Sequence, residues 1–331
     1  MRDIAKETPL GSGPVFLGGY PKSGTTLLCA LLDSHPKLVV FPDETKYLST
    51  FRFNEELGFR DELARYIDRF HLFGKESLYS SGYRDYTHID FSVFRDAALE
   101  YFDASDGAVA RGLEAVMLGY KKAIGRAALP AKKWVEKTPR NERYFELARS
   151  WWPEAKLIVM IRDPREALLS HRRYQIKRSS NKRIALGDFV LAWLDSYERA
   201  SAEIREDSSR AMIVRFESLV ATRVGTMEDV ASFMNIPVDP TLFIPTKAGK
   251  DWEGNSSHGD SKISNVKADT VKLVRLGGLE IIYINYILGF AIKEFGYPLS
   301  SWFPSLPKKL SKANGKIGRV IQRIGNSFSK E

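Results

Sequence analysis

The sequence predicts an α/β fold in which a parallel β-sheet of the P-loop type is flanked by helices. Short apolar runs rich in Val, Ile or Phe recur along the chain, and helix-like segments separate most of them. These runs are continuously apolar instead of alternating, which is typical of strands buried on both faces of a parallel sheet. The expected strands are residues 15–19, 38–41, 133–135, 156–161 and 211–216.

Two further segments complete the predicted organisation. Residues 47–130 interrupt the alternation of strands and helices as a mainly helical insertion rich in aromatic residues, most of which we expect in its core. Residues 276–295 read as a late helix, ended by Gly296 and Pro298. We expect residues 1–300 to form a single domain and residues 301–331 to form a basic tail.

Composition excludes several classes of protein. The 331 residues are 44% hydrophobic and 27% charged, which is ordinary for a globular protein and excludes general disorder. The one cysteine, Cys29, cannot form an intrachain disulfide. Residues 1–10 have no apolar core typical of a signal peptide, and the apolar run Ile281–Ile292 is too short to span a bilayer. We therefore expect a soluble, cytoplasmic protein.

Most of the formal net charge of +9 lies in the tail. The folded body is then only mildly basic, which argues against a dedicated nucleic-acid binder. Within residues 307–331, apolar residues recur at helical spacing beside Lys and Arg, a pattern suited to peripheral binding at an anionic membrane surface. Glycines in the same segment equally favour a disordered tail, since each weakens a helix. A non-enzymatic membrane- or polyanion-binding protein is therefore one alternative.

The first strand runs directly into a glycine-bounded loop, Gly19–Thr26, with the sequence G-Y-P-K-S-G-T-T. A helical run follows, so backbone N–H groups and the positive end of the helix dipole converge on one anion. The spacing mimics the nucleoside-triphosphate loop G-x-x-x-x-G-K-[ST], but Thr25 stands where the lysine is expected and Lys22 lies inside the loop. A nucleotide or small-molecule kinase is therefore a disfavoured alternative.

A second candidate anion site follows the strand at residues 156–161. Asp163 is placed to cap the next helix, Pro164 occupies its first position, and Glu166 would complete a capping box. None of this explains Arg162, whose charge ends an apolar strand and requires an anionic partner.

At these residues the chain resembles the sulfotransferases that use 3′-phosphoadenosine 5′-phosphosulfate (PAPS). The stretch G-Y-P-K-S-G-T-T-L-L, followed by L-D-S-H-P and E-T-K, is most similar to the tyrosylprotein and bacterial carbohydrate-type branches. The resemblance implies that the 5′-phosphosulfate is bound by Lys22, Ser23, Gly24, Thr25 and Thr26.

The resemblance also implies the other nucleotide contacts. Arg162 and Ser170, eight residues apart, match the pair that binds the 3′-phosphate in the family. Phe216 stands where the family has a tyrosine, so a hydroxyl contact to the nucleotide is lost. A late loop resembles the segment that closes over the nucleotide, and its candidate residues are Asn255, Ser256, Ser257 and Lys262.

Three residues are expected at the reaction centre. Lys137 lies in E-K-T-P, which resembles the lysine loop of the family, but the histidine base of the cytosolic branch is absent two residues later. Glu44, after the second strand, matches the catalytic glutamate of the other branches and is the expected general base. Lys22 is expected to stabilise the leaving phosphate, with help from Lys137. No metal is implied, because the donor has no triphosphate that needs Mg²⁺.

The resemblance therefore implies a PAPS-dependent O-sulfotransferase. A hydroxyl of a carbohydrate or glycolipid is the expected acceptor, held on the side of the helical insertion at residues 47–130.

Overall fold

A computed structural model describes residues 10, 13–50, 58–70, 86–126, 128, 130–177, 184–252 and 275–298. The chain divides into two compact units, residues 1–274 and 275–331. The predicted nucleotide-loop residues 255–257 and 262, and the basic tail at 301–331, lie outside the described residues.

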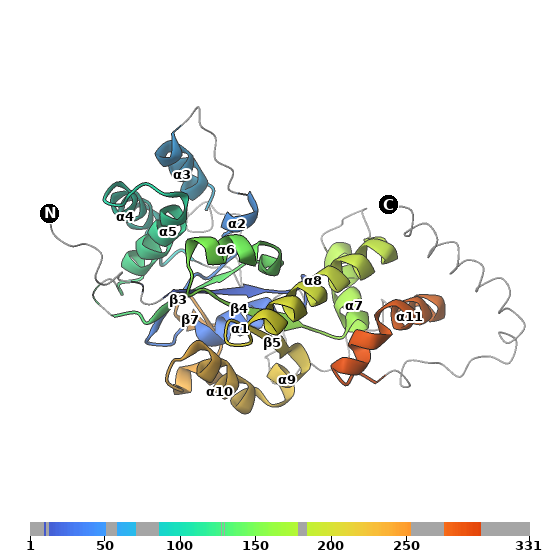
Figure 1. The fold of residues 1–331 in the computed structure, drawn as a ribbon. Helices are drawn as coiled ribbons and strands as arrows, with labels where there is room; N and C mark the ends of the chain where they lie inside the picture. The colour runs from blue at the N-terminus through green and yellow to red at the C-terminus, as the bar shows by residue number, and fades with distance from the viewer. Residues whose placement is uncertain are drawn as a thin grey trace, which may run out of the picture. The chain divides into compact units, whose positions relative to one another are not determined.

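The first unit is built on a five-stranded sheet in which every neighbouring pair of strands is parallel. Its strands are β1 (Pro14–Gly18), β2 (Leu38–Val40), β3 (Lys133–Lys137), β4 (Lys156–Ile161) and β5 (Ala211–Arg215). Their order across the sheet is β2-β3-β1-β4-β5. Figure 1 shows α6 (Phe145–Trp151) on one side of this sheet and α10 (Arg223–Met234) on the other. All five strands were predicted, and the expected α/β parallel fold is confirmed.

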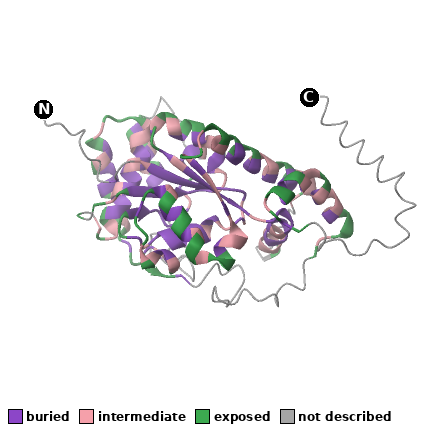
Figure 2. Cartoon of the chain, turned by 60° about the horizontal axis from the view of Figure 1, so that its bottom comes forward, coloured by how far each residue is buried: buried purple, intermediate pink, exposed green. Residues whose placement is uncertain are grey.

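Helices cover both faces of this sheet (Figure 2). Because successive side chains of a strand point to opposite faces, Phe16 joins one buried cluster whereas Val15 and Leu17 join another. The helices outside the insertion are α1 (Thr25–Leu32), α6 (Phe145–Trp151), α7 (Pro164–Lys177), α8 (Leu186–Glu206), α9 (Phe216–Ala221) and α10 (Arg223–Met234). Short 3₁₀ turns are η2 (Asn141–Tyr144) and η3 (Pro240–Phe243). Side chains of α1 and α10 share the cluster that contains Val15.

The predicted insertion is helical where it is described. It contains α2 (Tyr47–Thr50), α3 (Phe59–Asp68), α4 (Phe91–Asp103) and α5 (Val109–Ala123). Aromatic rings fill its interior, as expected: those of Phe70, Phe94 and Tyr120 surround Phe41, which follows β2. This packing attaches the insertion to the edge strand of the sheet.

The start of α7 departs from the prediction in one respect. Asp163 caps the helix as expected, because its Oδ1 accepts from the backbone N–H of Arg165 at 2.9 Å. The expected capping box with Glu166 is wrong, since the backbone N–H of Asp163 donates to Glu217 on α9 at 3.1 Å. Glu166 instead faces Arg162 at 3.7 Å. The Asp163 N–H is therefore bonded to the distant carboxylate of Glu217 and not to the nearby one of Glu166.

The motif L-D-S-H-P after α1 anchors distant segments. Oδ2 of Asp33 accepts from the Thr246 hydroxyl at 2.9 Å and from the Gly249 backbone at 2.8 Å. These two residues belong to a hairpin formed by β6 (Thr246–Lys247) and β7 (Lys250–Asp251). Nδ1 of His35 accepts from the Lys37 backbone at 3.1 Å, so Nε2 carries the proton and donates to the Pro237 carbonyl at 3.0 Å.

The second unit contains α11 (Gly278–Glu294), which confirms the predicted late helix. It ends two residues before Gly296, whose φ of 67° lies in the left-handed region that glycine favours. Among the helices described, none combines the length and the apolarity needed to cross a bilayer.

The environment of His35 predicts a pH-dependent contribution to stability. Burial lowers the pKa of His35; the nearby charges are Asp239, which opposes the shift, and Arg126 and Lys37, which reinforce it. The folded state therefore binds fewer protons than the unfolded state, and stability falls as the pH drops below about 6.5. We expect His35→Gln to lower the free energy of unfolding at pH 7.5 and to make it less dependent on pH.

The measurement is urea denaturation at pH 7.5 and 5.5. The wild type should lose more stability than His35→Gln between these values, by at most about 1.4 kcal/mol per pH unit. Equal losses in the two proteins would contradict the neutral state assigned to His35.

Candidate functional site

The candidate site lies where the loops that follow β1, β2, β3 and β4 leave the sheet. All four strands are parallel, so their carboxyl ends share one edge, where ligands of open α/β sheets bind. The loops after β1 and β3 are joined directly, since the backbone N–H of Arg140 donates to the carbonyl of Gly19 at 3.0 Å. The predicted phosphate loop and the predicted lysine loop are therefore neighbours.

The phosphate loop needs unusual backbone angles and close packing. Gly19, Lys22 and Gly24 have φ values of 121°, 77° and 101°. A Cβ on Gly19 would overlap the carbonyl of Met160, and a Cβ on Gly24 would overlap the ring of Phe216. The two glycines are thus required both by backbone angle and by the approach of β4 and α9.

The loop offers unused hydrogen-bond donors. Gly24 is the N-cap of α1 and supplies no side-chain cap, so N–H groups in the first turn remain available to an anion. The hydroxyl of Ser23 is fully buried and has no hydrogen-bond partner among the described residues. A buried hydroxyl is costly without a partner. The loop therefore fits the 5′-phosphosulfate that the sequence implies.

Glu142, a buried residue that the sequence did not single out, is hydrogen-bonded to this loop. Oε2 of Glu142 accepts from the backbone N–H of Gly19 at 2.7 Å, and Oε1 accepts from the hydroxyl of Ser196 on α8. Burial raises the pKa of Glu142. Glu142 lies in the short turn η2, where no sequence pattern distinguishes a buried glutamate from an exposed one.

The residues of the second predicted anion site follow β4, since Arg162 stands between β4 and α7 and Ser170 lies on α7. The guanidinium of Arg162 lies 4.4 Å from the ring centroid of Phe216, and its NH1 group donates to the Lys22 carbonyl at 3.4 Å. Burial lowers the pKa of Arg162, as expected for a cation removed from water. Ser170 is 93% buried on α7. Phe216 thus contacts both Arg162 and the glycine turn of the phosphate loop.

Helix α7 also contacts the phosphate loop through side chains that the sequence did not single out. The ammonium of Lys22 lies 3.4 Å from the ring centroid of Tyr174, and the Tyr20 hydroxyl is 3.0 Å from Nδ1 of His171. These contacts place Lys22 beside the helix that carries Ser170.

The reaction-centre residues predicted after β2 and β3 meet each other. Oε1 of Glu44 is 3.4 Å from Nζ of Lys137, and Oε2 is 3.9 Å from Nζ of Lys46. Burial alone would lower the pKa of Lys137, but the surrounding acidic groups, first among them the carboxylates of Glu44 and Asp43, outweigh it and raise the pKa. The side chain of Lys137 is 3% exposed and that of Glu44 is 28% exposed.

The two neighbouring carboxylates differ in environment. Asp43 is buried, and its Oδ1 accepts from the backbone N–H of Glu44 at 2.8 Å. Glu44 keeps a solvent-accessible carboxylate beside Lys137, so of this pair it is the group that an incoming hydroxyl can reach. In the described part of the chain, no cluster of three or more His, Cys, Asp or Glu side chains could hold a metal ion.

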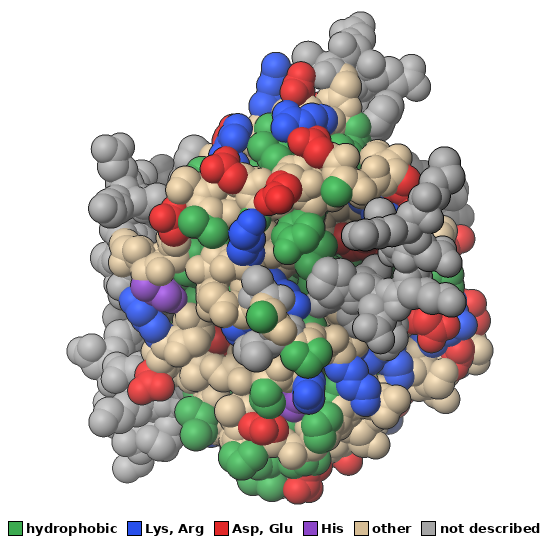
Figure 3. All heavy atoms as spheres, turned by 90° about the vertical axis from the view of Figure 1, so that its left-hand side faces the viewer, with side chains coloured by type: hydrophobic (Ala, Val, Ile, Leu, Met, Phe, Trp, Pro, Cys, Tyr) green, Lys and Arg blue, Asp and Glu red, His purple; other side chains and the backbone are tan. Residues whose placement is uncertain are grey.

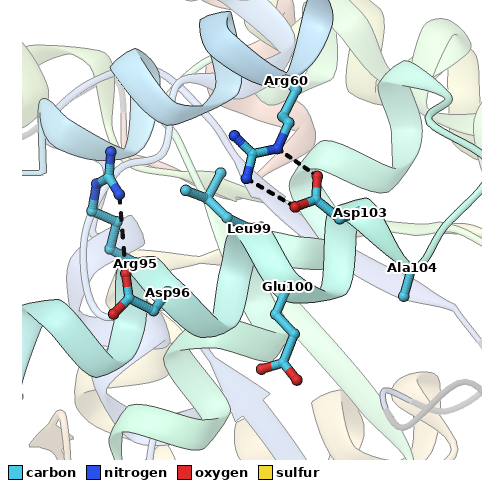
Figure 4. Close-up of a pocket in the computed structure, with 7 residues that line it drawn as sticks. All are labelled: Arg60, Arg95, Asp96, Leu99, Glu100, Asp103 and Ala104. Atoms are coloured by element: carbon cyan, nitrogen blue, oxygen red, sulfur yellow. Dashed lines mark hydrogen bonds and ion pairs between the residues drawn. The ribbon is translucent and has the colours of Figure 1, made fainter.

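A concave region lies on the insertion, between α3 and α4. Arg60 reaches across it to Asp103 through two hydrogen bonds of 2.6 and 2.9 Å, and Arg95 lies beside Asp96 (Figure 4). Both arginines of this region therefore lie within 4.0 Å of a carboxylate. Acidic and basic side chains are also interspersed on the face shown in Figure 3, which shows no extended basic patch.

Comparison with known proteins gives one family. The profile described as "Sulfotransferase family" matches residues 14–240. Protein-tyrosine sulfotransferase 1 of Danio rerio is 23% identical over 97% of this chain and 73% of its own length. Protein-tyrosine sulfotransferase 2 of Gallus gallus is 23% identical over 97% of this chain and 70% of its own. The sulfotransferase domain of the Synechococcus PCC 7002 olefin synthase superposes with a TM-score of 0.49 and 19% identity, covering 85% and 96% of the two chains.

The glycine geometry predicts the effect of adding one methyl group to the phosphate loop. In Gly24→Ala, the left-handed backbone costs about 1–3 kcal/mol and the new Cβ displaces Phe216. We expect the affinity for adenosine 3′,5′-bisphosphate, measured by calorimetry, to fall at least ~10-fold.

Gly225→Ala is the matched control. Gly225 lies in α10 with no atom within 4 Å of an added Cβ, so its substitution should leave ligand binding unchanged. Wild-type affinity in Gly24→Ala would show that the loop does not bind this ligand.

Proposed function

The chain belongs to the sulfotransferase family, and on that premise we propose that Glu44 and Lys137 form the reaction centre of a PAPS-dependent O-sulfotransferase. The observation that carries this proposal is the 3.4 Å pair of Glu44 with a buried lysine, one strand away from the phosphate loop. The kinase and the non-enzymatic alternatives have no support among the comparisons.

Donor binding is proposed to use the two anion sites. Residues 22–26 would hold the 5′-phosphosulfate, because the uncapped start of α1 and the buried Ser23 hydroxyl offer donors. Arg162 and Ser170 would hold the 3′-phosphate, and Phe216 lies against both Arg162 and the glycine turn of the loop. Asn255, Ser256, Ser257 and Lys262 are retained as further candidate contacts on the basis of the sequence alone.

When bound, the donor supplies an electrophilic sulfur and a phosphate leaving group. Glu44 would accept the proton of the acceptor hydroxyl as the acceptor oxygen bonds to sulfur and the bond from sulfur to the phosphate oxygen breaks. Lys137 holds the Glu44 carboxylate from its buried side. Lys22, inside the phosphate loop, would stabilise the negative charge that develops on the departing phosphate.

For the acceptor, we favour a tyrosyl hydroxyl over the carbohydrate or glycolipid hydroxyl expected from the sequence. The support is that two relatives matched over 97% of this chain are named protein-tyrosine sulfotransferases. A tyrosine-containing peptide is therefore the first acceptor to test, and an oligosaccharide is the second. Sulfation of the oligosaccharide alone would reverse this preference.

The second anion site predicts selectivity between nucleotides. Arg162→Ala should lose affinity for adenosine 3′,5′-bisphosphate while its weaker affinity for AMP, which has no 3′-phosphate, changes little. A charged hydrogen bond to a phosphate supplies about 1.5–3 kcal/mol, or roughly 10- to 150-fold in affinity. Calorimetry without Mg²⁺ measures both ligands, and equal affinities in the wild type would contradict the assignment.

The proposed base predicts a loss of turnover without a loss of donor binding. Glu44→Gln keeps the shape of the side chain but cannot accept the proton, so kcat should fall by ~10²-fold or more. Asp43→Asn should affect kcat far less, because Asp43 is buried and can still accept from the Glu44 backbone.

The measurement is sulfate transfer to the accepted hydroxyl at saturating donor, with donor affinity determined separately. Normal turnover in Glu44→Gln would exclude Glu44 as the base, and a selective loss in Asp43→Asn would reverse the two roles.

A further inference from the structure

We propose that Glu136 is a positioning residue of this reaction, which together with Thr45 and Thr138 sets the spacing between Glu44 and Lys137. This inference rests on the proposed function, because it assumes that Glu44 is the base. The name "carboxylate clamp" is used below for Thr45, Glu136, Thr138 and Asn141.

The carboxylate of Glu136 lies at the centre of the clamp. Its Oε1 accepts from the Thr45 hydroxyl at 2.7 Å, the Thr45 backbone at 3.3 Å and the Thr138 hydroxyl at 2.6 Å. Its Oε2 accepts from the side-chain amide of Asn141 at 2.5 Å. Four donors from three other residues therefore converge on one carboxylate.

The two hydroxyl groups are oriented by a second set of hydrogen bonds. Each hydroxyl donates its single hydrogen to Glu136 and uses a lone pair to accept from a backbone N–H group. Thr138 accepts from Lys46 at 2.9 Å, and Thr45 accepts from Tyr47 at 3.1 Å. The loop after β2 is thus held at several successive positions against the end of β3.

These contacts surround the proposed reaction centre. Glu44 directly precedes Thr45, and Lys137 lies between Glu136 and Thr138 in the chain. The Asn141 amide also donates to the Leu17 carbonyl at 3.1 Å, which connects the clamp to the strand that leads into the phosphate loop. The clamp therefore controls where the base stands relative to both the lysine and the donor site.

Glu136 cannot take part in the chemistry directly. It is 1% exposed, whereas Glu44 retains an accessible carboxylate. Burying a carboxylate is costly, and replacing buried ionic groups with apolar side chains of similar volume is often neutral or stabilising. A buried carboxylate that joins Thr45, which follows Glu44, to Thr138, which follows Lys137, is therefore better explained by the geometry it imposes than by stability.

The test replaces one hydroxyl without changing the shape of the side chain. Thr138→Val removes the donor to Glu136 and the acceptor for Lys46. We expect kcat to fall ~10- to 100-fold, because a displacement of about 1 Å can cost this much. The dissociation constant for adenosine 3′,5′-bisphosphate should stay within about 2-fold of wild type, since a displaced base lowers kcat without removing a donor contact.

Two matched variants separate positioning from general destabilisation. Thr138→Ser keeps the hydroxyl and should retain at least half of the wild-type kcat. Met234→Ala removes a buried side chain at the end of α10, so it should lower the melting temperature without lowering kcat. Glu136→Gln should reproduce Thr138→Val, because either orientation of its amide places an NH₂ group against a donor, the Asn141 amide or the Thr45 backbone N–H.

The outcomes distinguish the two proposals. Wild-type kcat in Glu44→Gln overturns the proposed base and, with it, the clamp. Loss of kcat in Glu44→Gln but not in Thr138→Val overturns the clamp alone, as does an equal loss in Thr138→Ser and Thr138→Val. In the double variant Glu44→Gln/Thr138→Val, the clamp predicts no further loss of kcat beyond that of Glu44→Gln, and multiplicative losses contradict it.

Discussion

The parallel pairing of β1 with β3 is the constraint on which the rest of the site depends. The register places Leu17 beside Lys137, so the chain enters the phosphate loop next to the point where β3 delivers its lysine. The strands are far apart in sequence, and the whole helical insertion lies between them. Because parallel strands need a long crossover connection, the insertion can be large without changing the position of either loop.

This pairing also explains why so many charged groups are buried at one edge of the sheet. Glu136, Glu142 and Lys137 are all less than 4% exposed. Glu136 accepts hydrogen bonds from the loops after β2 and β3, and Glu142 accepts one from the loop after β1, which offsets the cost of removing charge from water. The edge is thus a connected polar network surrounded by two apolar clusters.

The strands and the phosphate loop could be predicted because each depends on residues that are contiguous in the sequence. Each of the five strands contains a run of buried or partly buried apolar residues because both faces of the sheet are covered, and those runs are visible in the sequence. The phosphate loop was equally visible, since glycine is needed at positions 19 and 24 and the loop residues are contiguous. Glu44 and Lys137 could be named as candidates, but their 3.4 Å separation could not, because they are 93 positions apart in the chain.

The hydrogen bonds that the sequence did not predict are those between residues of distant segments. Glu166 was expected to cap the backbone of Asp163, but Glu217 takes that position because β5 pairs with β4 and starts α9 alongside α7. The hydrogen bonds to Glu136 and Glu142 likewise form only when the loops after β1, β2 and β3 lie side by side. The sequence by itself determined which segments form strands and where an anion can bind, since those properties depend on neighbouring residues. Only the tertiary structure decided which buried carboxylate meets which donor, because hydrogen-bond partners depend on positions in space and not on spacing along the chain.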